Sequence, residues 1–296
     1  MQDRATAGLL QELQQQVLDT PDTWWTESSD LCATAADAFL ELGQFESALK
    51  YFEQAVASER ADAPIRALEQ LASCKVRWAR SLARTEEARA KAPALLDEAE
   101  GVIRHLLALG ETSERWSLLG SVMKQKATLA STPETRQQAL REMSEAYGKA
   151  YEKSKKDGTA DSYPLGNQLA ADVVLSWQNG ASGNGHVAAV SARLAELEEA
   201  ANKRLAEHTD AYNLSAAADR LLLQALLERK LDEAARQAIS QKFVNAMSRG
   251  TTTRVRDSMR AQFDFFRSFL VDAALPKEVS DEMRDSLQRL QEMLTA

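Results

Sequence analysis

The sequence predicts an all-α fold of antiparallel helix pairs, and three observations lead to this prediction. The chain of 296 residues contains 50 Ala and 38 Leu, so nearly a third of it consists of two strong helix formers. Gly and Pro number only 12 and 6 and aromatic residues make up 6%, which excludes an all-β, collagen-like or low-complexity chain. Apolar residues recur at helical spacing in almost every segment, and no segment predicts a convincing strand.

Start and stop signals divide the first half of the chain into helices. Pro21 ends the first helix, Gly43 splits a helical pair, and Gly110 ends a later helix. Asp62 can cap the helix that has Pro64 in its first turn. The expected helices span residues 4–19, a pair within 29–58, 65–82, 93–109 and a helix that starts at Thr112 or Ser113.

Similar signals divide the second half. Thr132-Pro133-Glu134 begins a long helix that reaches about Ser154, and three glycines predict a flexible loop at residues 178–186. A terminal helix from about Pro276 repeats apolar residues at spacings of four, three and four: Met283, Leu287, Leu290 and Leu294. The other expected helices span residues 165–177, 187–207, 211–229, 231–248 and 252–272.

Residues 31–57, LCATAADAFLELGQFESALKYFEQAVA, show the pattern of a helix–turn–helix repeat. Small residues at Ala36, Ala48 and Ala55 let two helices approach closely, aromatic residues fill the remaining apolar positions, and Gly43 makes the turn. This segment resembles the tetratricopeptide repeat (TPR). The resemblance implies a right-handed superhelical solenoid of antiparallel helix pairs, in which the first helix of each pair lines a concave inner surface.

Decayed copies of this repeat follow along the chain. Ser113–Gly120 resembles the opening of a first helix, and Ala99, Ile103 and Leu106 fit a second helix whose partner is separated from it by an insertion. We therefore expect four regions. These are an N-terminal helix and connector (1–28), TPR-like repeats (29–157), degenerate TPR-like repeats that include the glycine loop (158–275), and a C-terminal capping helix (276–296).

A finer resemblance concerns two segments, Ala63–Ala72 and Arg254–Phe269. Both are similar to repeat arrays in bacterial multidomain proteins that carry a caspase-like (CHAT) protease or another effector domain. This resemblance implies a sensing or regulatory module, and the chain contains no protease motif that would extend it to catalysis.

The residue types needed for catalysis or metal binding do not form recognisable motifs. The three histidines occur without a His-Glu-x-x-His pattern, and Cys32 and Cys74 lie in apolar segments where burial is expected. The glycine loop follows a helix rather than a strand, which argues against a phosphate-binding loop. We expect no catalytic residue, no cofactor and no metal site.

Composition also bounds the partners and the compartment. A net charge of −8 argues against nucleic acid as a partner, since nucleic-acid binding needs a basic surface. No apolar run is long enough to cross a membrane, and no signal peptide is recognisable. Two cysteines are too few for a disulfide framework, so a reducing, cytoplasmic location is expected.

The sequence therefore predicts a non-catalytic scaffold or sensor that binds a peptide or protein segment in a concave groove. Two alternatives remain open. The chain is either a regulatory domain or subunit that controls a bacterial effector enzyme such as a CHAT-type protease, or a structural module that oligomerises through its terminal helix.

Candidate partner-binding residues follow from placing first helices on the concave side. Lys75, Arg77, Arg80 and Arg84 form a cationic cluster, with Arg66 earlier on the same helix, and arginine can bind a carboxylate bidentately. The phenylalanines between Phe263 and Phe269 are either a buried cap or an aromatic docking patch, represented by Phe265. Reversing the charges of Arg77 and Arg80 is expected to leave stability nearly unchanged. The candidates are Asp37, Arg77, Arg80, Ser121, Lys124 and Phe265.

Overall fold

The computed structural model describes residues 8, 11–12, 15–16, 28–57, 64–178, 184–207, 211–248 and 253–294. Every regular element in these residues is a helix, which confirms the predicted all-α fold class. Most of the expected helix at 4–19 and most of the glycine loop lie outside the described residues. No helix in the described part is both long and apolar enough to cross a bilayer.

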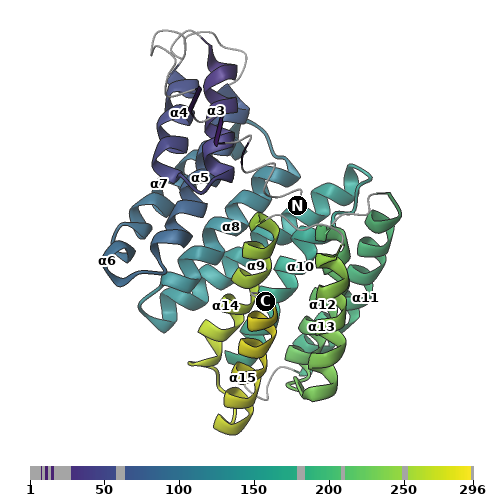
Figure 1. Cartoon of the computed structure of the whole chain (residues 1–296). Coiled ribbons are helices and arrows are strands. Elements are labelled where there is room, and N and C mark those ends of the chain that lie inside the picture. Colours follow the sequence, from purple (N-terminus) through teal and green to yellow (C-terminus); the bar gives the residue numbers. More distant parts are fainter. Residues whose placement is uncertain are drawn as a thin grey trace. The chain divides into compact units, whose positions relative to one another are not determined.

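The chain divides into two compact units, Met1–Leu129 and Ala130–Ala296 (Figure 1). The four regions expected from repeat content do not use this boundary, and they stay a prediction. The helices of the first unit are α3 (Ser29–Glu41), α4 (Phe45–Ala57), α5 (Pro64–Leu82), α6 (Glu86–Arg89), α7 (Ala92–Leu109) and α8 (Ser113–Leu129).

Helices α3 and α4 form the antiparallel hairpin that the repeat pattern predicts. The Ser28 side chain accepts a hydrogen bond from the Leu31 amide at 3.3 Å and caps α3. Gly43 makes the turn with φ of 74°, a left-handed conformation that glycine adopts without steric cost. Ala36 and Ala48 are completely buried between the helices, and the Phe39 and Tyr51 rings stack at 5.3 Å.

Helix α5 packs against α4, α7 and α8 within this unit. Its packing on α7 confirms the pairing expected across the insertion, since Ala99, Ile103 and Leu106 of α7 are all fully buried. The short helix α6 occupies the insertion between the two partners.

Two helices of the second unit, α9 (Pro133–Lys156) and α11 (Asn184–Glu207), are each 24 residues long. Thr132 caps α9 by accepting a hydrogen bond from the Thr135 amide at 3.3 Å. Helix α10 begins three residues earlier than expected, because the Asp161 side chain accepts a hydrogen bond from the Tyr163 amide and Pro164 fits a first helical turn. The helices are α9 (Pro133–Lys156), α10 (Ser162–Gln178), α11 (Asn184–Glu207), α12 (Ala211–Leu227), α13 (Glu233–Met247), α14 (Thr253–Leu270) and α15 (Lys277–Met293).

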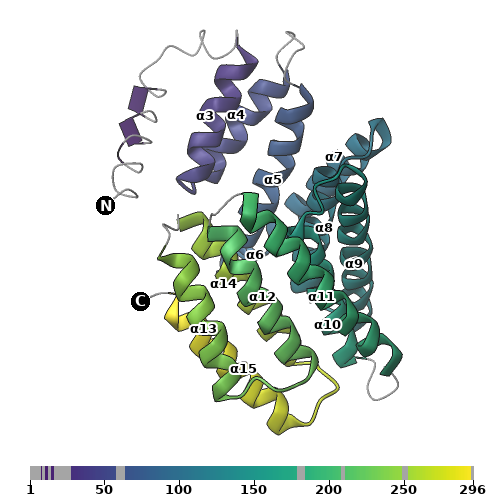
Figure 2. The same ribbon diagram turned by 90° about the vertical axis from the view of Figure 1, so that its right-hand side faces the viewer.

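Helix α10 is the centre of the second unit. It packs against α9, α11 and α12, and Figure 2 shows α9, α10 and α11 running side by side. Trp177 near its end is fully buried, donates a hydrogen bond from Nε1 to the Leu226 carbonyl at 3.3 Å, and lies 6.1 Å from the Phe266 ring of α14. The C-terminal part of the chain therefore closes over the end of α10.

The aromatic residues of α14 and the apolar stripe of α15 belong to this core. Phe265 is only 2% exposed and contacts the rings of Phe266 and Phe269, so its assignment to a partner-docking patch was wrong. The aromatic face of α14 is buried, and this burial holds the last helices of the second unit together. The apolar stripe of α15 is likewise buried, at Met283, Leu287, Leu290 and Leu294.

The α3–α4 hairpin leaves no space for a larger side chain at Ala48. We expect Ala48→Trp to lower the free energy of unfolding by about 1–3 kcal/mol or more, because overpacking forces the helices apart. Urea denaturation followed by circular dichroism measures the change. Glu53→Trp, at an exposed position of the same helix, is the control and should unfold like the parent; equal stability of both variants would contradict the packing.

Candidate functional site

One face of α5 is polar along its whole length. Arg66, Gln70, Ser73, Arg77 and Arg80 follow one another at spacings of four, three, four and three, which places them on one side of the helix. All five are at least partly exposed, whereas the opposite positions are buried. We refer to these five residues as the α5 stripe.

Helix α3 borders the stripe on one side. Arg77 donates from Nη2 to the Leu40 carbonyl at 3.2 Å, and its Nη1 lies 3.5 Å from Oε1 of Glu41. Leu40 and Glu41 end α3, where carbonyl groups lack helical partners and the helix dipole favours a cation. Arg77 therefore fastens α5 to the end of α3, and Asp37 lies one turn earlier on α3.

Helix α8 borders the stripe on the other side through a buried ion pair. Nε of Arg115 lies 2.7 Å from Oε1 of Glu69, and both residues are less than 10% exposed. Nη1 of Arg115 also donates to the carbonyls of Leu106 at 3.1 Å and Gly110 at 2.5 Å, at the end of α7. One guanidinium thus joins α5, α7 and α8.

The beginnings of α5 and α8 also influence each other electrostatically. Burial, with a smaller contribution from Glu69, raises the pKa of the Glu114 carboxyl, and Arg66 and Arg115 oppose this shift. Arg66 of the stripe is therefore close enough to act on the charge of Glu114 at the start of α8.

Five of the six residues predicted as a site lie on helices of the first unit. Asp37, Arg77 and Arg80 lie on α3 and α5, and Ser121 and Lys124 lie on α8; all are half-buried and all make interactions within the protein. We use the name α3–α5–α8 face for the α5 stripe together with Asp37 of α3 and Ser121 of α8. Phe265 is buried in the core of the other compact unit.

One expectation about the cationic cluster was wrong. Lys75 is 7% exposed and pairs with Glu98 of α7, on the side of α5 opposite the stripe. The helical period separates Lys75 from Arg77 and could have shown this from the sequence, and the same period could have identified Gln70 and Ser73 as stripe residues. Because Arg77 contacts α3, we now expect that reversing its charge lowers the stability.

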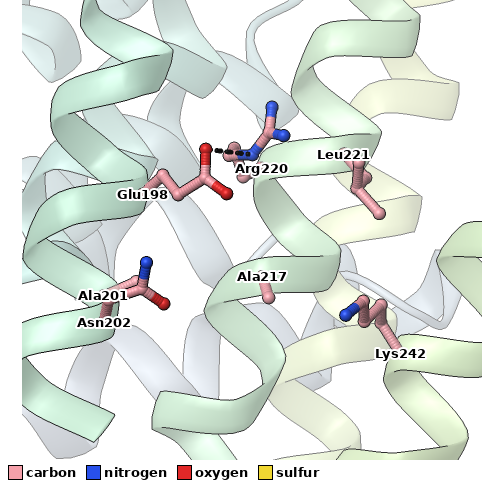
Figure 3. Close-up of a pocket in the computed structure, with 7 residues that line it drawn as sticks. All are labelled: Glu198, Ala201, Asn202, Ala217, Arg220, Leu221 and Lys242. Atoms are coloured by element: carbon pink, nitrogen blue, oxygen red, sulfur yellow. Dashed lines mark ion pairs between the residues drawn. The ribbon is translucent and has the colours of Figure 1, made fainter. Parts of the chain in front are cut away.

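Three other features of the described residues offer no catalytic or metal site. A hollow of about 160 Å³ between α11, α12 and α13 is smaller than ordinary small-molecule pockets, and its walls hold an ion pair between Glu198 and Arg220 at 3.3 Å (Figure 3). Burial raises the pKa of both thiols, that of Cys74 to about 12, so neither is an activated nucleophile. The part of the chain with described positions has no cluster of three His, Cys, Asp or Glu able to hold a metal.

Comparison with known protein families supports the resemblance to the tetratricopeptide repeat. Residues 44–176 match the family model described as Tetratricopeptide Repeats-Sensor. The match covers α4 to α10 and includes the α5 stripe. Neither the curated proteins nor the solved structures contain a match to the chain.

The buried pair predicts unequal effects of single and double substitutions. We expect Arg115→Met to lower the free energy of unfolding by about 3–5 kcal/mol, because it leaves the Glu69 carboxylate buried without a partner and removes the guanidinium hydrogen bonds to the α7 end. Glu69→Gln, which keeps a hydrogen-bond acceptor, should cost less. Adding Glu69→Met to Arg115→Met should restore part of the lost free energy of unfolding, as measured by urea denaturation. If the losses of the two single variants simply add in the double variant, the two residues do not stabilise the protein as a pair.

The contacts of Arg77 predict a stability effect that Arg66 lacks. We expect Arg77→Glu to lower the free energy of unfolding by about 1.5–3 kcal/mol, because a carboxylate would face Glu41 and the carbonyl end of α3. Arg66→Glu on the same stripe, at an exposed position, is the matched control and should change the melting temperature little. Equal melting temperatures for the two variants would show that the α3 contact is not stabilising.

Proposed function

We propose that the first unit, which shares α4 to α8 with the segment matched by the Tetratricopeptide Repeats-Sensor model, is a non-catalytic module that binds a peptide or protein segment on the α3–α5–α8 face. Repeats of this family are generally non-enzymatic interaction scaffolds. A protein-interaction or sensing role is accordingly the function that the family match supports. The choice of face is our proposal.

The observation that carries this choice is the polar α5 stripe. Helix α5 packs mainly against α4, α7 and α8, and the side that stays partly exposed holds arginine, glutamine and serine. Neighbouring helices hold it in place through Arg77 and through the Arg115–Glu69 pair. A stripe fixed in this way loses little conformational freedom when a partner binds.

The sensor description of the family favours a second proposal about the consequence of binding. Partner binding would then be the input to an effector enzyme, such as a CHAT-type protease, on the same or another chain.

The third expectation, oligomerisation through the terminal helix, loses its basis because the apolar stripe of α15 is buried within the second unit. We retain the cytoplasm as the proposed location, since two buried free thiols suit a reducing compartment.

Site-specific photo-crosslinking tests the proposed face. A photoreactive amino acid replaces Gln70 on the stripe in one sample and Ala94, an exposed residue of α7, in the control. After irradiation in host cells, we expect a discrete protein adduct from position 70 that is absent from position 94. Adducts from position 94 alone, or none from position 70, would overturn the choice of face.

A further inference from the structure

The charges on the α3–α5–α8 face are sorted by helix. The α5 stripe carries three arginines and two neutral polar residues and no acid. The acids of the surroundings lie on α3, at Asp37 and Glu41, and at Glu114 where α8 begins. The chain as a whole has a net charge of −8, so a stripe with only positive charges departs strongly from the average surface.

We propose that the segment bound by this face is acidic and lies extended along the α5 stripe, with its carboxylates paired to Arg66, Arg77 and Arg80. This inference rests on the proposed function and gives the chemical class of its partner. Arginine suits the role because its planar guanidinium offers five donors and binds carboxylates bidentately.

Arg77 and Arg80 already interact within the protein, so the acidic segment is a further partner of these side chains. Arg77 uses Nη2 for the Leu40 carbonyl and lies 3.5 Å from Glu41, a long and weak ion pair that holds the guanidinium in position. A guanidinium that is already oriented loses less entropy when it binds a second carboxylate. Arg66 is exposed at the other end of the stripe.

The dimensions of the stripe set the length of the segment. Arg66 and Arg80 are fourteen residues apart on one helix, which corresponds to about 21 Å at a rise of 1.5 Å per residue. An extended chain advances about 3.3–3.6 Å per residue, so the stripe matches a segment of about six residues. Acidic residues near both ends of such a segment would reach Arg66 and the Arg77–Arg80 end.

The character of the stripe excludes an apolar anchor as the main source of affinity. The large hydrophobic side chains that are exposed in the described residues do not lie on it: Leu31, Ile65, Leu109, Tyr163, Val244 and Val271. Affinity must then come from hydrogen bonds and charge, and salt weakens it. A nucleic acid would also offer negative charge, but the acids of α3 beside the stripe disfavour a phosphate backbone that carries charge at every step.

Fluorescence anisotropy with defined probes tests the proposal on the full chain. The probes are a labelled twelve-residue peptide of alternating Glu and Ser, the same peptide with Gln in place of Glu, and a labelled oligothymidylate. We expect the acidic peptide to bind at least about tenfold more tightly than the Gln peptide, since three charge-assisted contacts are lost in the latter. Raising the salt concentration from about 50 to 300 mM should weaken its binding severalfold.

Two variants locate the binding. Arg66→Gln removes an exposed charge from the stripe and should weaken binding of the acidic peptide about threefold to tenfold, and adding Arg80→Gln should weaken it further. Arg89→Gln with Lys91→Gln removes two exposed charges away from the stripe and is the control, with binding unchanged apart from a small long-range effect. Circular dichroism checks that each variant is folded. If the variant with both Arg66→Gln and Arg80→Gln does not fold, Arg66→Gln alone still tests the proposal.

The outcomes separate this inference from the proposed function. Equal binding of the acidic and Gln peptides, or tighter binding of oligothymidylate, would overturn the acidic class. Equal loss in the stripe and control variants would overturn the stripe as its site. A crosslink from position 70 together with either of these results would leave the face as a binding surface and reject only the chemistry assigned to its partner.

Discussion

The buried ion pair between Arg115 and Glu69 is the interaction on which the first unit depends. Its guanidinium binds a carboxylate on α5 and two carbonyls at the end of α7 from a position at the start of α8. Two charges this far from water are stable only when each finds its partner, so the pair fixes which turn of α8 meets which turn of α5. The position of the α5 stripe relative to α8 follows from that register.

Arginine side chains cap helix ends elsewhere in the protein by the same means. Arg77 donates to the Leu40 carbonyl at the end of α3, and Arg260 of α14 donates to the Leu294 carbonyl after α15 at 3.0 Å. In each case a cation from one helix donates to a carbonyl at the end of another helix and complements its dipole. The chain has few glycines to end its helices, and these arginines both cap helices and join them.

The two units use their surfaces differently. In the second unit, Trp177 and the phenylalanines of α14 bury the centre of the helix array, so the aromatic residues contribute to closure of the unit. In the first unit, the side of α5 that lies between α3 and α8 stays polar and partly exposed. A family described as a sensor is consistent with this arrangement, because a rigid polar stripe can bind a partner without disturbing the core beneath it.

The sequence by itself determined the all-α fold, most helix ends and the α3–α4 hairpin, because these depend on local signals: apolar period, caps, and small residues such as Ala36 and Ala48. It also placed Arg77 and Arg80 on one face of α5. Only the tertiary structure decided which charges are structural. Lys75 finds Glu98 and Arg115 finds Glu69 at separations of 23 and 46 residues, and Phe265 lies in a core formed by neighbours distant in sequence. Helical period shows which residues share a face, but the identity of what covers that face depends on packing between helices, which no local pattern encodes.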